Sequence, residues 1–115
     1  MVTIMAKPVH IETIDARFQE LRDKILSVLE PYQVKRVALF GSAARGDDTP
    51  NSDIDILVTL KPPGERPVIG LKWFDLSDTL SRMLNRPVDL VTEDGLSPYI
   101  RPYIEQELVI LYEEE

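Results

Sequence analysis

The chain has 115 residues, of which 43% are hydrophobic and 29% are charged, and its formal net charge is −7. This length and composition predict a single globular domain over residues 1–115, with a core at about 11–112, and exclude a large multidomain enzyme. The chain has no cysteine and one histidine, His10, which excludes disulfides, thiolate chemistry and histidine-rich metal sites.

The negative charge and the absence of long apolar runs also limit the partners. Nucleic-acid backbones are bound mainly through lysine and arginine, so we expect no direct binding of DNA or RNA. No apolar run approaches the ~20 residues that cross a bilayer, and the amino-terminal MVTIMAKPVH lacks the apolar core of a secretory signal. We therefore expect a cytoplasmic protein that does not enter a membrane.

Helix-type and strand-type patterns alternate along the chain. Apolar residues three and four positions apart predict two long helices, and short apolar runs bounded by turn residues predict strands. The expected order is a helix at 11–30, strands at 34–40 and 54–60, a helix at about 71–85, a strand at 88–92, a two-turn helix capped by Ser97 and a strand at 108–112. This order predicts an α/β fold in which helices flank a mixed β-sheet, with the strand order left open.

Three aspartates accompany two of these strands. Asp53 and Asp55 are two positions apart, so their side chains share one face, with Cα atoms ~6.6 Å apart. Asp89 interrupts an apolar strand, where it needs a partner or a cation. If the two strands are neighbours, the three carboxylates line one pocket, and an all-oxygen ligand set suits Mg²⁺ or Mn²⁺. The alternatives are an exposed polar strand face and a salt bridge from Asp89 to Arg86 or Arg45.

The Gly41-Ser42 step directly follows the first strand and has the features of an anion site. Gly41 permits a tight turn and close approach of a ligand, and Ser42 can cap the next turn while backbone N–H groups face the anion. Arg45, one turn further, can add charge-assisted contacts to phosphate. The same pattern also describes an ordinary strand-to-helix connection, and it is neither a Walker A loop nor a dinucleotide fingerprint.

The segment GSAARGDDTPNSDIDILV places Gly41-Ser42 ten residues before Asp53-x-Asp55, and this resembles the signature of the DNA polymerase beta-like nucleotidyltransferase superfamily. Together with RPVDLVTEDGLSPYIRPYI and ELVILYE, the segment looks like the minimal nucleotidyltransferase branch, over about residues 20–112. The resemblance implies the polymerase beta-like fold and transfer of a nucleoside monophosphate, AMP from ATP above all, to a hydroxyl group.

The resemblance also assigns roles to the residues already singled out. Asp53 and Asp55 would bind two Mg²⁺ ions, and Asp89 would complete the catalytic metal site and help to activate the attacking hydroxyl. The β/γ-phosphates would be held by the Gly41-Ser42 turn, with Arg45 as a helper.

Minimal members of this superfamily are similar to the antitoxin half of two-gene modules, whose toxin is a HEPN-type ribonuclease silenced by AMP on a tyrosine. The resemblance therefore implies an adenylyltransferase antitoxin with such a toxin as its partner. The chain lacks a second domain for an antibiotic or tRNA, which favours an acceptor on a partner protein. Two alternatives stay open: an antitoxin that neutralises by binding alone, and a transferase that acts on a small hydroxylated molecule.

Overall fold

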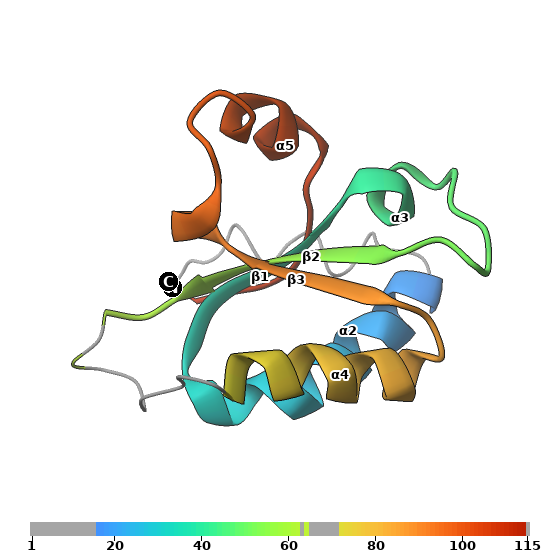
Figure 1. Ribbon diagram of the computed structural model, residues 1–115, viewed down its shortest axis with the longest axis horizontal. Coiled ribbons are helices and arrows are strands. Elements are labelled where there is room, and N and C mark those ends of the chain that lie inside the picture. The colour runs from blue at the N-terminus through green and yellow to red at the C-terminus, as the bar shows by residue number, and fades with distance from the viewer. Residues whose placement is uncertain (1–15, 63, 65–71, 115) are drawn as a thin grey trace, which may run out of the picture.

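A computed structural model of the protein describes residues 16–62, 64 and 72–114 (Figure 1). The described elements are, in chain order, the helix α2 (Ala16–Leu29), the 3₁₀ turn η2 (Glu30–Tyr32), β1 (Val34–Phe40), α3 (Gly41–Arg45), β2 (Ile54–Leu60), α4 (Lys72–Leu84), β3 (Val88–Thr92), the 3₁₀ turn η4 (Glu93–Gly95), α5 (Arg101–Glu107) and β4 (Val109–Glu113).

Most of these elements lie where the sequence predicted them. The bounds of β1, β2 and β3 agree with the expected strands, and β4 begins and ends one residue later than expected. The expected helices at 11–30 and 71–85 correspond to α2 and α4, and Pro31 falls in the 3₁₀ turn that follows α2. His10 and the first residues of the expected first helix, 11–15, lie outside the described residues.

The four strands form one mixed sheet in the order β3-β2-β1-β4 (Figure 1). β1 is antiparallel to both β2 and β4, whereas β2 is parallel to β3. The central place of β1 agrees with its apolar end, since Val37, Ala38 and Leu39 are fully buried. The expected α/β class with a mixed sheet is therefore confirmed, and the structure supplies the strand order.

Helices α2 and α4 pack against one face of the sheet, whereas α3 and α5 lie on the other side (Figure 1). The main core lies beneath α2 and α4. It combines buried residues of the two helices with alternate strand residues: Ile25, Leu29, Leu76, Leu80, Val37, Leu39, Ile54, Ile56 and Val58. Because strand side chains alternate between faces, Asp53 and Asp55 are directed to the side of α3 and α5.

The turn before α5 differs from the prediction. Ser97 was expected to cap this helix, but its Oγ accepts the N–H of Tyr99 at 3.1 Å, and its carbonyl accepts the N–H groups of Ile100 and Arg101. Serine readily closes such local turns with its own side chain. Ser97 therefore closes a separate turn, and the two-turn helix begins at Arg101.

Two further expectations at the surface are wrong. The three- and four-residue spacing of apolar residues in the second long helix predicts a buried stripe that includes Met83, but Met83 is 40% exposed because the last turn places Leu84 against the core. The glutamates after the last expected strand predict a solvated tail. Instead, the Glu114 N–H donates to the Lys35 carbonyl at 2.8 Å and its carboxylate pairs with Lys61 at 2.9 Å.

Within the described part of the chain, no helix combines the length and the apolar character that crossing a membrane requires.

Candidate active site

The turn after β1 is built around Gly41. Its φ is +71°, a left-handed conformation that favours glycine. A Cβ atom placed on Gly41 would overlap Oδ2 of Asp55, because Phe40 and Asp55 are register partners and the chain turns directly over the carboxylate. The glycine is therefore required for two reasons: the backbone conformation, and the closeness of the aspartate.

Ser42 lies inside the first turn of α3 rather than at its cap. The residue that precedes the helix is Phe40, which makes no side-chain capping bond, so the expected capping role of Ser42 is wrong. The short helix instead closes through the Ser42 carbonyl, which accepts the N–H groups of Gly46 at 3.0 Å and Asp47 at 3.2 Å. Within the described residues the Ser42 hydroxyl makes no hydrogen bond, which leaves it available to a ligand.

The parallel pairing of β2 and β3 brings the aspartates together. Asp55 and Asp89 are direct register partners, and Asp53 precedes β2 on the same face as Asp55. β2 and β3 are therefore neighbours, as a shared site for the three aspartates requires. Arg86 pairs with another residue, as does Arg45, so among the described residues Asp89 gains no salt bridge from either arginine.

The electrostatics of the cluster are those of uncompensated negative charge. Partial burial raises the pKa of Asp55, and the charges of Asp89, Asp53 and Glu107 raise it further, while Arg45 acts in the opposite direction. A carboxylate surrounded by other negative charges, as Asp55 is, is stabilised in its ionised form by a nearby cation. The cluster therefore favours a bound cation.

The donor set fits an ion that arrives together with phosphate. Among the described residues, no group of three or more aspartate, glutamate, histidine or cysteine side chains is arranged so that it could hold a metal ion by itself. Magnesium usually keeps several waters and is held by one or two carboxylates together with substrate phosphates. Asp53, Asp55 and Asp89 place carboxylates beside the glycine turn, so an ion there would need further oxygen ligands from water or from a substrate phosphate.

Glu107 belongs to this site but was not found from the sequence. It is the last residue of α5, and its Oε2 accepts the Gly41 N–H at 2.8 Å. Its Oε1 accepts Nη1 of Arg45 at 3.0 Å, and Nε of the same arginine donates to Asp47 at 3.3 Å. Glu107 lies 66 positions after Gly41, and no local pattern indicates such a contact.

The loop between α3 and β2 is held by Arg86. Its Nε and Nη2 donate to the Ser52 carbonyl at 3.1 and 2.9 Å, and Nη2 also pairs with Asp48 at 2.9 Å. The Ile54 N–H then donates to the Pro87 carbonyl at 2.9 Å. These contacts fix the loop just before and after Asp53.

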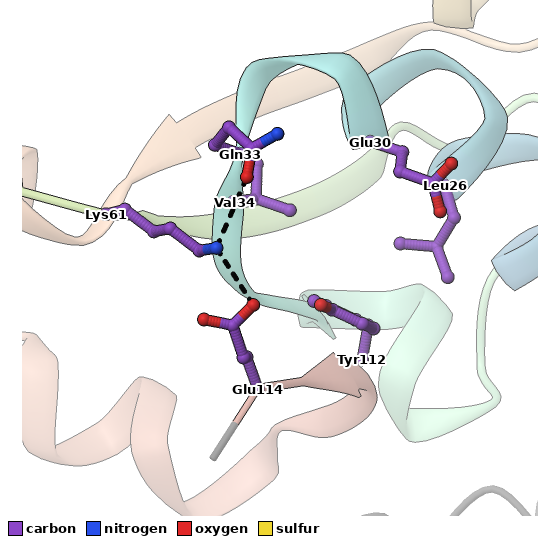
Figure 2. A pocket seen from close by; sticks show the side chains of 7 residues that line it. All are labelled: Leu26, Glu30, Gln33, Val34, Lys61, Tyr112 and Glu114. Atoms are coloured by element: carbon purple, nitrogen blue, oxygen red, sulfur yellow. Dashed lines mark hydrogen bonds and ion pairs between the residues drawn. The ribbon is translucent and has the colours of Figure 1, made fainter. Parts of the chain in front are cut away.

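A separate hollow of about 100 Å³ lies at the other end of β1, near Val34 (Figure 2). Figure 2 shows Lys61 between the side chains of Gln33 and Glu114, at 3.3 and 2.9 Å. None of the residues singled out from the sequence lines this hollow. It is therefore separate from the aspartate cluster.

Comparisons with known proteins agree with the residue pattern. A family model described as "Nucleotidyltransferase domain" matches residues 21–111. A Methanocaldococcus jannaschii protein named "Putative protein adenylyltransferase MJ0126" is 35% identical over 102 residues, 88% of this chain and 100% of that relative. The protein adenylyltransferase MntA of Thermococcus cleftensis is 34% identical over 100 residues, 86% of this chain and 90% of that protein.

A solved structure of a toxin–antitoxin with AMP-PNP also contains a similar chain. The two chains are 25% identical with a TM-score of 0.69, and the match covers 82% of this chain and 74% of that one.

Proposed function

The chain belongs to the nucleotidyltransferase domain family, as a minimal member with the polymerase beta-like fold, and from this premise we propose that it is a protein adenylyltransferase. It transfers AMP from ATP to a hydroxyl group of a partner protein, and the partner is a HEPN-type ribonuclease toxin modified on a tyrosine. Support comes from two relatives named as protein adenylyltransferases and from the similar toxin–antitoxin structure with AMP-PNP.

One observation carries the proposal. The parallel register sets Asp55 beside Asp89, and the same Asp55 carboxylate lies against Gly41 at the start of α3. An acidic cluster and a turn that we propose to bind phosphate are therefore adjacent. A nucleoside triphosphate with its divalent cations is a ligand that uses both halves of such a site.

The residues of the chain have distinct roles in the proposed transfer. Gly41 and Ser42 hold the β/γ-phosphates, with Arg45 adding positive charge. Asp53, Asp55 and Asp89 would hold two Mg²⁺ ions, or Mn²⁺, which would supply positive charge to neutralise the attacking and leaving oxygens.

In the transfer itself, the acceptor oxygen forms a bond to the α-phosphorus of ATP, and the bond from that phosphorus to the bridging oxygen breaks to release pyrophosphate. Asp89 accepts the hydroxyl proton from the acceptor as the oxygen attacks, which raises the nucleophilicity of that oxygen.

The proposal is tested with labelled ATP, Mg²⁺ and the purified partner toxin. We expect the wild-type protein to label the toxin, and Asp53→Asn and Asp55→Asn to lower the rate on the order of 10²-fold or more, because each loses a carboxylate ligand charge. Circular dichroism establishes that the variants fold. An unlabelled toxin, or equal rates for the wild type and both variants, would rule out this mechanism.

A further inference from the structure

The carboxylate of Glu107 contacts two groups that are proposed to meet the triphosphate. It accepts the Gly41 N–H at 2.8 Å through one oxygen and Nη1 of Arg45 at 3.0 Å through the other. Glu107 is only 27% exposed in its side chain, whereas Arg45 is 50% exposed. A partly buried carboxylate with both oxygens engaged is held more firmly than the surface arginine that it contacts.

The two carboxylates around Arg45 hold only part of its guanidinium. Nε donates to Asp47 and Nη1 to Glu107, while Nη2 makes no hydrogen bond with the described residues. A guanidinium carries five N–H donors in a rigid plane, so fixing two nitrogens also fixes the direction of the third. Arg45 is thereby arranged in advance, with donors left over for an incoming anion.

Helix α5, which carries Glu107, is itself tied to the sheet. Nη1 of Arg101 donates to Glu93 at 2.8 Å, Nη2 of Arg36 donates to Glu105 at 3.1 Å, and Ile104 is buried. Glu107 therefore extends from a helix that is held in place, and this helix fixes where its carboxylate can reach.

The negative charge of Glu107 opposes phosphate binding, although its hydrogen bonds hold groups that are proposed to bind phosphate. It adds to the negative potential at Asp55 and would repel a phosphate placed at the same donors. Two roles are therefore open to Glu107. Either the triphosphate must displace it, or it stays in place and holds the Gly41 turn and Arg45 in position for the triphosphate. The second role is favoured, because Nη2 of Arg45 and the Ser42 hydroxyl make no hydrogen bond with the described residues. Phosphate can bind to these two groups while Glu107 keeps its contacts.

We propose that Glu107 is a positioning residue, which holds the Gly41 turn and the Arg45 guanidinium in the arrangement that receives the triphosphate of the substrate. This inference rests on the proposed function, because it needs a nucleoside triphosphate at this site.

The first test is calorimetric binding of Mg²⁺-ATP to the purified full chain. We expect Glu107→Ala to raise the Kd about tenfold, because both charge-assisted contacts are lost. Glu107→Gln should bind more weakly than wild type but more tightly than Glu107→Ala, because its amide oxygen still accepts the Gly41 N–H. If Glu107 merely occupies the phosphate position, both variants bind more tightly than wild type, and the inference is overturned.

Arg45→Ala completes a double-mutant cycle with Glu107→Ala. Since Glu107 acts partly through Arg45, its removal should weaken binding less in the Arg45→Ala background than in wild type. Fully additive effects would contradict positioning through the arginine. In the transfer assay, Glu107→Ala should raise the KM for ATP more than it lowers kcat, because triphosphate binding is affected before the chemical step.

Glu105→Gln is the matched control on the same helix, since it loses the charge of the ion pair with Arg36 but leaves Gly41 and Arg45 untouched. We expect its Kd to stay within about twofold of wild type. An equal loss in Glu105→Gln and Glu107→Ala would assign the effect to anchoring of α5 and overturn the proposal. If Glu107→Ala does not fold, the test is the Kd of Glu107→Gln for Mg²⁺-ATP, which should be higher than that of the wild type.

The outcomes separate this inference from the proposed function. A wild-type protein that binds no Mg²⁺-ATP would contradict the proposed function and the inference with it. A wild type that binds and transfers, with an unchanged Kd in Glu107→Ala, would contradict the role of Glu107 alone.

Discussion

Gly41 is the first residue of α3 and Gly46 directly follows this helix, and the two glycines have similar backbone conformations but different surroundings. Their φ angles are +71° and +83°, both in the left-handed region. A Cβ on Gly41 would overlap the Asp55 carboxylate, whereas a Cβ on Gly46 would meet nothing within 4 Å. The two positions therefore separate the effect of backbone strain from the effect of displacing a proposed metal ligand.

This difference predicts the behaviour of two alanine variants. Gly41→Ala and Gly46→Ala should each lose about 1–2 kcal/mol of unfolding free energy, the cost of a left-handed alanine, with a further loss in Gly41→Ala from the overlap. Only Gly41→Ala should also slow AMP transfer, on the order of 10²-fold, because Asp55 must move. Denaturant unfolding and transfer rates measure the two effects. Similar transfer rates in both variants would show that the contact with Asp55 is unimportant.

At the scale of the elements, Arg86 connects the start of β3 to the loop that leads into β2. Its side chain is 17% exposed and makes two hydrogen bonds to the Ser52 carbonyl in addition to its pair with Asp48. From the sequence, a salt bridge between Arg86 and Asp89 was one alternative. The structure instead assigns it to the loop, which leaves Asp89 available beside Asp55.

Arg86→Ala should therefore lower both stability and activity. We expect a loss of about 1–3 kcal/mol, because a charged hydrogen-bond donor is removed from a partly buried carbonyl and carboxylate, and slower transfer because Asp53 is less well positioned. Arg82→Ala is the control on α4, since Arg82 pairs with Asp78 at the surface, where such pairs contribute about 0.3–0.5 kcal/mol. Thermal unfolding and transfer assays compare the two variants. Equal losses of stability and of transfer rate would show that Arg86 does not hold the loop that positions Asp53.

At the scale of the whole molecule, the proposed toxin partner could be neutralised either by transfer of AMP or by contact alone. The net charge of −7 suits association with a basic ribonuclease whether or not AMP is transferred. The aspartates occupy a small part of the surface, so removing their charges leaves most of any docking surface intact. Catalysis and binding are thus separable in one variant.

The double variant Asp53→Asn/Asp55→Asn should still bind the toxin but should not suppress its ribonuclease activity. The reason is that neutralisation in the proposed function depends on the transferred AMP. Pull-down with the partner and RNA cleavage at equimolar protein measure the two properties. Full suppression by this variant would support the alternative in which the antitoxin acts by binding alone.

Sequence and tertiary structure contributed different parts of the site. The strands, the glycine turn and the three aspartates were predictable, because a two-residue alternation, a breaker after an apolar run and a charge inside a strand are local signals. That Asp53, Asp55 and Asp89 bind metal, and that Gly41, Ser42 and Arg45 bind phosphate, stay predictions. The capping role of Ser42 was wrong, because the residue at the cap is Phe40 and the helix begins two residues earlier than a Ser42 cap would require.

The sequence by itself determined which residue types stand at the ends of the strands, since alternation and turn chemistry depend on neighbours a few positions apart. Only the tertiary structure decided that β3 lies parallel to β2 with Asp55 opposite Asp89, and that Glu107 contacts Gly41 from the end of α5. Such contacts join residues 34 and 66 positions apart. They depend on strand order and on how α5 packs, which short-range periodicity does not encode.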